Sequence, residues 1–365
     1  MQELILANNS STLKEMSETA ISLLKELIEI PSFSREESKT ADVLQDFLES
    51  HEVTTLRYKN NIWATNSGYD KNLPTILLNS HHDTVKPNSR YTLNPFEAKE
   101  KDEKIYGLGS NDAGGALVSL LLTFLNFNSN RKLKYNLVFA ATAEEEISGE
   151  NGIVSIIDQL GKIDFAIVGE PTEMKLAIAE KGLLVLDCIA KGKAAHAAHD
   201  NPDNAIVNAF RDIDWINKFQ FPQKSEMLGD VKMNVTMINA GTQHNVIPGK
   251  CEFVVDIRTT DIYKNTEVLE ILKANITSEI LPRSLRLNAS AIDKTHPIIA
   301  AAMECGIQTF GSSTLSDQAL LNFPSVKIGP GNSLRSHSGD EFIFIEEIEN
   351  GIELYIEMLS KIIEI

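Results

Sequence analysis

The sequence contains few cysteines, little positive charge and no long apolar run, and each shortage excludes a class of protein. Its three cysteines, Cys188, Cys251 and Cys305, lie far apart and form no CxxC pair, so neither a disulfide framework nor a thiolate zinc site is indicated. No segment approaches the roughly 18 consecutive apolar residues of a membrane-spanning helix, and the amino terminus lacks the pattern of a secretory signal. We therefore expect a cytoplasmic protein.

Positive charge is scarce, because 34 lysines and arginines stand against 51 acidic residues and give a formal net charge of −17. This charge repels phosphate backbones and anionic lipids, so we expect no nucleic-acid or membrane partner. Small cationic molecules are less disfavoured. A merely solubilising acidic surface explains the charge equally well, so the charge alone identifies no substrate.

The apolar pattern of the first part of the chain predicts an α/β fold with a mostly parallel sheet. The spacing from Leu13 to Ile28 predicts an amphipathic helix that Pro31 ends. Buried strands are expected at residues 73–80, 135–143 and 165–169, with a helix at 113–127. In such folds ligands bind beyond the carboxyl ends of the strands.

From about residue 176 the pattern changes to strands that flank two helices. The expected order is strand 176–192, helix 201–219, strands 231–241 and 251–260, helix 265–280 and strand 285–292. This β-α-β-β-α-β order is that of a ferredoxin-like unit. A strand at 323–331 and a helix near 346–363 resume the first pattern. We therefore expect one domain of residues 1–175 and 291–365, with residues 176–290 inserted as a second domain.

Two of the expected strands end near side chains that could bind a cation together. Side chains alternate faces along a strand, so His81 and Asp83 can share a side while His82 faces away. A carboxylate beside a metal-bound histidine fixes its tautomer and orientation. Glu144, Glu145 and Glu146 follow the strand at 135–143. On its own, however, an HxD sequence more often contains a structural histidine, and a run of acids more often forms a solvated face.

Three further residues extend this set. Asp112 stands just before the expected helix at 113–127, Glu170 follows the strand at 165–169, and His337 lies late in the chain. A buried carboxylate is costly unless it is paired or binds a metal, so acids at several strand ends favour a cation site. A helix N-cap remains the alternative interpretation of Asp112.

Seven motifs, in order along nearly the whole chain, resemble those of the M20 family of zinc amidohydrolases and peptidases, which includes acetylornithine deacetylase, succinyl-diaminopimelate desuccinylase and carboxypeptidase G2. The motifs are SHHDTV, GLGSNDAGG, TAEEEISGENG, VGEPT, GKAAHAAHDNPDNAI, NVIPGKCEFVVDIR and GPGNSLRSHSGDEF. The resemblance implies a zinc-binding catalytic domain, an inserted lid and dimerisation domain, and a homodimer. By the same resemblance, cobalt or manganese could take the place of zinc.

The resemblance also assigns roles to the candidate residues. It implies that His81 and Glu170 bind one zinc, that Glu146 and His337 bind the second, and that Asp112 bridges both. Glu145 would be the general base and Asp83 the residue that orients His81. His196 in the inserted domain would stabilise the oxyanion in the other subunit of the dimer.

The resemblance also assigns substrate-binding roles to residues of both domains. These residues are Arg258, Asn245, Gly329, Gly331 and Glu180. A guanidinium fits an α-carboxylate with two hydrogen bonds, although an arginine on an alternating strand is most often an exposed surface residue. The two glycines would allow a close approach of the backbone to the substrate. The carboxylate of Glu180 would pair with the side-chain ammonium of ornithine. The alternative is that Glu180 is simply a solvated residue.

Within the family the resemblance is greatest to the acetylornithine deacetylase branch of arginine biosynthesis. We therefore expect a zinc-dependent deacylase that acts on an N-acyl-L-amino acid, preferably N-acetyl-L-ornithine, with acetylcitrulline and succinylornithine as variants. The alternatives are a succinyl-diaminopimelate desuccinylase, a dipeptidase or aminopeptidase on the same scaffold, and a non-catalytic amino-acid-binding protein.

Overall fold

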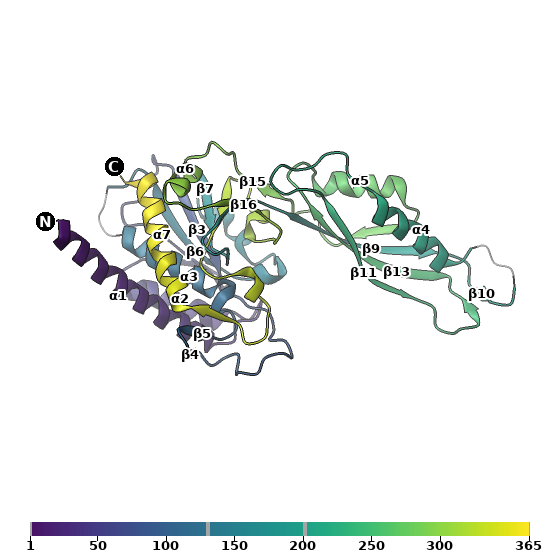
Figure 1. The fold of residues 1–365 in the computed structure, drawn as a ribbon, viewed down its shortest axis with the longest axis horizontal. Coiled ribbons are helices and arrows are strands. Elements are labelled where there is room, and N and C mark those ends of the chain that lie inside the picture. Colours follow the sequence, from purple (N-terminus) through teal and green to yellow (C-terminus); the bar gives the residue numbers. More distant parts are fainter. Residues whose placement is uncertain (1, 129–131, 200–202, 365) are drawn as a thin grey trace. The chain divides into compact units, whose positions relative to one another are not determined.

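The computed structural model describes residues 2–128, 132–199 and 203–364, with side chains from residue 12 onward (Figure 1). The chain divides into two compact units. Unit 1 comprises Met1–Ile178, Ile292–Phe310 and Ser316–Ile365, and unit 2 comprises Ala179–Ala291 and Gly311–Leu315. The catalytic, lid and dimerisation roles expected of the two domains stay predictions.

Unit 1 is built on a β-sheet whose central strands are parallel. The strand order is β1-β2-β6-β3-β7-β17-β8, and β6, β3, β7 and β17 run parallel, whereas β1, β2 and β8 pair antiparallel. The strands are β1 (Thr55–Tyr58), β2 (Asn61–Thr65), β3 (Thr75–His81), β6 (Asn136–Thr142), β7 (Phe165–Val168), β8 (Leu176–Glu180) and β17 (Ser325–Lys327), and β16 (Thr309–Ser312) also pairs with β8. The predicted α/β class with a mostly parallel sheet is confirmed.

Helices cover one face of this sheet. Helix α3 packs on β3 and β6, and α1 and α7 pack on α3. The helix is therefore buried on nearly all sides, in agreement with its mostly apolar sequence. The helices are α1 (Gln2–Ile28), α2 (Ser38–Ser50), α3 (Gly115–Asn128), α6 (Pro297–Glu304) and α7 (Ile345–Ile363). On the other face short 3₁₀ segments place Ile153, Ile156 and Leu160 against strand residues such as Leu77 and Val138.

A small antiparallel sheet lies next to the loop that contains His337. Its order is β18-β5-β4, with β4 (Lys99–Lys101), β5 (Lys104–Tyr106) and β18 (Phe342–Phe344). Because β18 begins five residues after His337 and continues into α7, this sheet anchors the carboxyl end of the loop.

Unit 2 has the predicted ferredoxin-like order. Its antiparallel sheet runs β11-β13-β9-β14, and α4 and α5 bury one face of it around Leu186, Phe253 and Val255. The elements are β9 (Gly182–Lys191), α4 (Ala205–Lys218), β11 (Lys232–Ala240), β13 (Lys250–Thr259), α5 (Asn265–Asn275) and β14 (Glu279–Pro282), and the short strands β10 (Ala195–His196) and β12 (Val246–Ile247) form a separate pair. Residues 201 and 202, where helix 201–219 was expected to begin, lie outside the described residues.

The last strand of the ferredoxin-like sheet was predicted in the wrong place. It is β14, whereas residues 285–292 contribute only β15 (Ser290–Ala291), which pairs with Glu180 and Ala179. Helix α5 ends at Asn275, earlier than expected, because buried Asp212 accepts hydrogen bonds from the amides of Thr277 (3.1 Å) and Ser278 (2.8 Å) and holds the chain in a turn.

Two expectations based on composition can be compared with the described residues. The three cysteines are free thiols, and Cys188 and Cys251 are buried. Within residues 2–128, 132–199 and 203–364, no helix combines the length and the apolar character needed to cross a membrane.

Candidate metal centre

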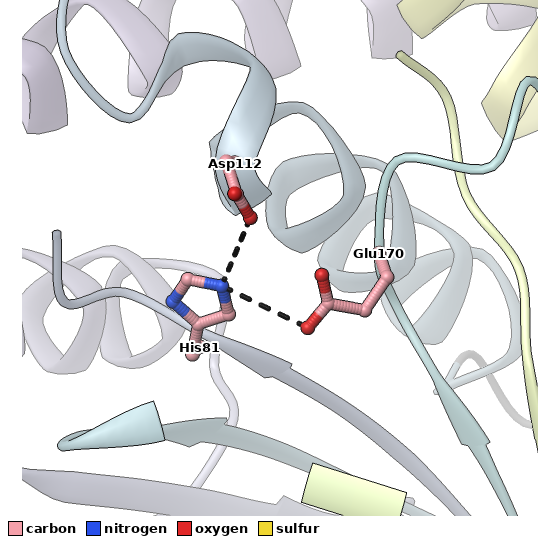
Figure 2. Close-up of side chains that lie close together, drawn as sticks. All are labelled: His81, Asp112 and Glu170. Atoms are coloured by element: carbon pink, nitrogen blue, oxygen red, sulfur yellow. Dashed lines mark ion pairs between the residues drawn. The ribbon is translucent and has the colours of Figure 1, made fainter. Parts of the chain in front are cut away.

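His81 ends β3 with its ring oriented by the backbone that follows. Its Nδ1 atom lies 2.9 Å from the carbonyl oxygen of Asp83 and 3.5 Å from the Asp83 carboxylate. A carbonyl oxygen only accepts hydrogen bonds, so Nδ1 is protonated and Nε2 keeps a lone pair when the ring is neutral. Nε2 is buried without a hydrogen-bond partner among the described residues. Figure 2 shows it facing Asp112 (3.4 Å) and Glu170 (3.8 Å).

The neighbouring His82 is a structural residue. Its Nδ1 lies 2.9 Å from the hydroxyl of Thr40 and its Nε2 lies 2.8 Å from the carbonyl oxygen of Asn60. Burial lowers the pKa of His82 to about 4, so the ring is neutral at physiological pH. Both ring nitrogens are thus engaged within the protein, in contrast to those of His81.

Asp112 lies in a short π-helical turn, Ser110–Gly114, and is not the N-cap of α3. Its backbone angles are non-helical (φ −122°, ψ 97°), and this turn directs the carboxylate toward His81. The amides of Asn111 and Asp112 donate to the carboxylate of Glu341, at 2.9 and 3.0 Å. The alternative interpretation of Asp112 as a helix cap is therefore wrong.

The run Glu144–Glu146 after β6 is not a solvated face. Glu144 is buried and accepts a hydrogen bond from the side chain of Asn151 at 2.7 Å. The amides of Glu145 and Glu146 donate to the two carboxylate oxygens of Asp83, at 3.0 and 3.2 Å, which fixes where their side chains begin. Glu145 and Glu146 are mostly buried, and Glu145 approaches His81 Nε2 to 4.0 Å.

His337 completes the site from the loop before β18. Its Nε2 lies 2.9 Å from Glu146 and 3.6 Å from the second carboxylate oxygen of Asp112. The hydrogen bond to Glu146 raises the pKa of His337 to about 9, in spite of its partial burial. Of the residues in the site, His337 is the most exposed, with 54% of its side chain accessible.

The candidate ligands form two groups that share Asp112. One group is His81, Asp112 and Glu170, and the other is Asp112, Glu146 and His337; within each, one ligand atom per residue lies within 4.8 Å of the others. The residues present fit a pair of divalent cations. Among the described residues, the buried Nε2 of His81 has no hydrogen-bond partner. Burial raises the pKa of Glu170 to about 8, and the charge of Asp112 adds to the effect. Imidazole together with carboxylate is a ligand set that zinc takes in proteins.

Several sequence-predicted residues belong to unit 2. His196 is exposed on β10, and its Nδ1 accepts a hydrogen bond from the amide of Ala198 at 3.1 Å. Arg258 is half-buried on β13 and makes a two-pronged ion pair with Asp256, at 2.8 and 3.1 Å. Asn245 is exposed, whereas Glu180 is fully buried, so the interpretation of Glu180 as a solvated residue is wrong.

Gly329 and Gly331 approach other parts of unit 1 closely. A Cβ atom on Gly329 would lie 2.5 Å from the carbonyl oxygen of Glu170, and one on Gly331 would lie 2.6 Å from the side-chain oxygen of Asn111. Gly331 also has a positive φ of 92°. Packing within the protein therefore accounts for both glycines, and their substrate-binding role stays a prediction.

Two buried acids beside the site were missed by the sequence reasoning. Asp317 accepts hydrogen bonds from Asn79 on β3 and Thr142 on β6, both at 2.9 Å, and burial raises its pKa to about 6. Glu341 holds the turn that carries Asp112. Glu341 stands in the GDEF sequence directly after SHS, and this acid, four residues after the predicted ligand His337, was the available signal.

Comparisons with known proteins agree with this geometry. The model of peptidase family M20/M25/M40 matches residues 77–361. The chain is 29% identical to an uncharacterized metallohydrolase of Methanocaldococcus jannaschii, covering 95% of this chain and 100% of that protein. It is 27% identical to the acetylornithine deacetylase of Proteus mirabilis, covering 94% and 96%.

A solved structure supports the fold. The chain superposes with a TM-score of 0.74 and 20% identity on a dinuclear metal-binding peptidase of family M20 from Bacillus subtilis, covering 96% of this chain and 98% of that one. Since the family model matches well over half of the sequence, the protein described here belongs to peptidase family M20/M25/M40.

Proposed function

We propose that this protein is a zinc-dependent amidohydrolase that removes the acyl group from an N-acyl-L-amino acid, with N-acetyl-L-ornithine as the preferred substrate. The observation that carries the proposal is the pair of ligand groups sharing Asp112, with the carboxylate of Glu145 beside them. His81 and Glu170 would hold one cation, Glu146 and His337 the other, and Asp112 both. Bound there, the cations would polarise the amide carbonyl and acidify water.

Glu145 would perform the proton transfer. Its carboxylate lies at the edge of the ligand groups, and Asp83 fixes its backbone. In the reaction water adds to the carbonyl carbon, and Glu145 accepts the proton that the water loses. The bond between the carbonyl carbon and nitrogen then breaks, and Glu145 returns the proton to the leaving amine. The products are a carboxylate and a free amino acid.

Residues of unit 2 would bind and orient the substrate. His196 is exposed, and with its Nδ1 accepting a hydrogen bond, the neutral ring carries its proton on Nε2, which suits a donor to an oxyanion. Arg258 would bind the α-carboxylate, in competition with Asp256, and Asn245 would assist. Glu180 would select for an ornithine ammonium. Resemblance to the family supports these roles and the assignment of His196 to the site of the partner subunit.

A substrate panel tests the proposal. Zinc-loaded protein is incubated with N-acetyl-L-ornithine, acetylcitrulline, succinylornithine, succinyl-diaminopimelate, and dipeptides and tripeptides, and the release of free amine is measured. We expect the highest kcat/KM with acetylornithine. Faster turnover of succinyl-diaminopimelate or of peptides would replace the preferred substrate. Tight binding of amino acids without any turnover would favour the non-catalytic alternative.

A further inference from the structure

We infer that Glu341 is a positioning residue of the metal centre, whose buried carboxylate fastens the peptide that carries Asp112 to the loop that carries His337. This inference rests on the proposed metal centre. Glu341 belongs to neither ligand group found among the described residues, so its role is distinct from metal binding.

The contacts of Glu341 are directed at the backbone beside Asp112. One carboxylate oxygen accepts hydrogen bonds from the amides of Asn111 (2.9 Å) and of Asp112 itself (3.0 Å). The carbonyl oxygen of Glu341 accepts a third hydrogen bond, from the amide of Gly107 at 3.0 Å. Glu341 therefore binds both ends of the segment 107–112, and His337 lies only four residues before it.

The same two segments are joined at a second point. The side-chain amide of Asn111 donates to the carbonyl oxygen of Asn332 (3.1 Å), and its oxygen accepts from the amide of Asn332 (3.0 Å). The missing side chain of Gly331 makes room for that oxygen. Residues 107–112 and 331–341 thus form one hydrogen-bonded assembly, in which Asn111 holds one end of the His337 loop and Glu341 the other.

Burying a carboxylate at this position costs free energy, so the acid needs a role that offsets the cost. Glu341 is 1% exposed, so a charged carboxylate there loses most of its hydration. A neutral acceptor would avoid this cost. Hydrogen bonds to a carboxylate are stronger than those to a neutral acceptor, and the non-helical turn at Asp112 needs acceptors for its amides. The presence of an acid here is therefore best explained by its effect on Asp112, whose backbone it holds in a defined position.

Zinc affinity measured without substrate tests this role. Zinc chloride is titrated into metal-free wild-type protein and into the Glu341→Gln and Glu341→Ala variants in competition with a chelating dye. We expect affinity to fall about 10- to 100-fold, as for other residues that support metal ligands, with Gln less affected than Ala. In the Asp112→Asn background, Glu341→Gln should have little further effect, because it acts through Asp112.

Asp212 provides a matched control. It is a buried carboxylate in unit 2 that likewise accepts two backbone amides, those of Thr277 and Ser278. Asp212→Asn should lower the Tm without changing zinc affinity. If Glu341→Gln keeps native circular dichroism and binds zinc as tightly as the wild type, the inference is wrong. A wild-type protein that binds no zinc would overturn the metal centre, whereas one that binds zinc but hydrolyses nothing would overturn only the proposed activity.

Discussion

The Nδ1 atom of His81 lies 2.9 Å from the carbonyl oxygen of Asp83, and this contact leaves Nε2 free to face Asp112 and Glu170. His82, one residue later, uses both ring nitrogens for hydrogen bonds inside the protein. The first histidine thus faces the candidate metal ligands and the second makes structural hydrogen bonds, because successive side chains at the end of a strand point to opposite sides.

Substituting each of these histidines should separate the two tasks. His81→Ala should remove at least one zinc from each chain, because it deletes a ligand of the first group. His82→Ala should keep the wild-type zinc content but destabilise the fold, by about 1–3 kcal/mol for each buried partner left without a hydrogen bond. Elemental analysis and urea unfolding measure the two effects. Loss of zinc from His82→Ala with full retention in His81→Ala would contradict the assignment.

Removing the proposed base should leave the metal centre intact. Glu145→Ala should reduce kcat by at least 10²- to 10⁴-fold, the usual contribution of a general base, while zinc content stays near that of the wild type. Single-turnover kinetics with acetylornithine and elemental analysis of the same sample provide the measurement. A variant that turns over at the wild-type rate would exclude Glu145 as the base.

A mixing experiment tests whether His196 acts on the partner subunit. Glu145→Ala and His196→Ala should each be nearly inactive alone. If the protein is a homodimer with His196 acting in trans, subunit exchange between the two variants restores about a quarter of the wild-type activity, because half of the dimers are mixed and each has one complete site. Sedimentation velocity establishes the oligomeric state. Mixed dimers that stay inactive would contradict action in trans.

A pH-dependent part of the stability of unit 1 should come from His296. Its Nδ1 caps α6 by accepting a hydrogen bond from the amide of Ile298 at 3.3 Å, and its ring packs edge-on against Phe165. Burial lowers the pKa of His296 below its ordinary value of 6.5, and Asp293 partly opposes this effect. Because the folded-state pKa is lower, the contribution is present above the unfolded pKa and is lost as the pH falls through the folded pKa.

The variant His296→Asn keeps an N-cap acceptor but cannot titrate. Its free energy of unfolding should fall less between about pH 7.5 and about pH 5 than that of the wild type. Urea denaturation at the two pH values measures the difference. An equal fall in both proteins would show that His296 makes no such contribution.

The sequence predicts those residues of the candidate site that lie at the ends of strands. His81 ends one parallel strand and Glu170 follows its neighbour, and the carboxyl ends of such strands meet at one edge of a sheet, so their convergence follows from alternation and topology. Glu341 could not be found in this way, because its partner amides lie about 230 residues earlier and depend on an irregular turn. The position of β14 likewise depended on Asp212, a long-range contact that no local pattern contains.

The central claim is that two groups of side chains sharing Asp112 bind a pair of cations. Crystals grown with zinc and measured at the zinc absorption edge test it directly. We expect two anomalous peaks about 3.5–4 Å apart, with ligand atoms at about 2.0–2.2 Å. One should lie among His81, Asp112 and Glu170, and the other among Asp112, Glu146 and His337. A map without peaks at these positions, from crystals soaked in excess zinc, would contradict the account.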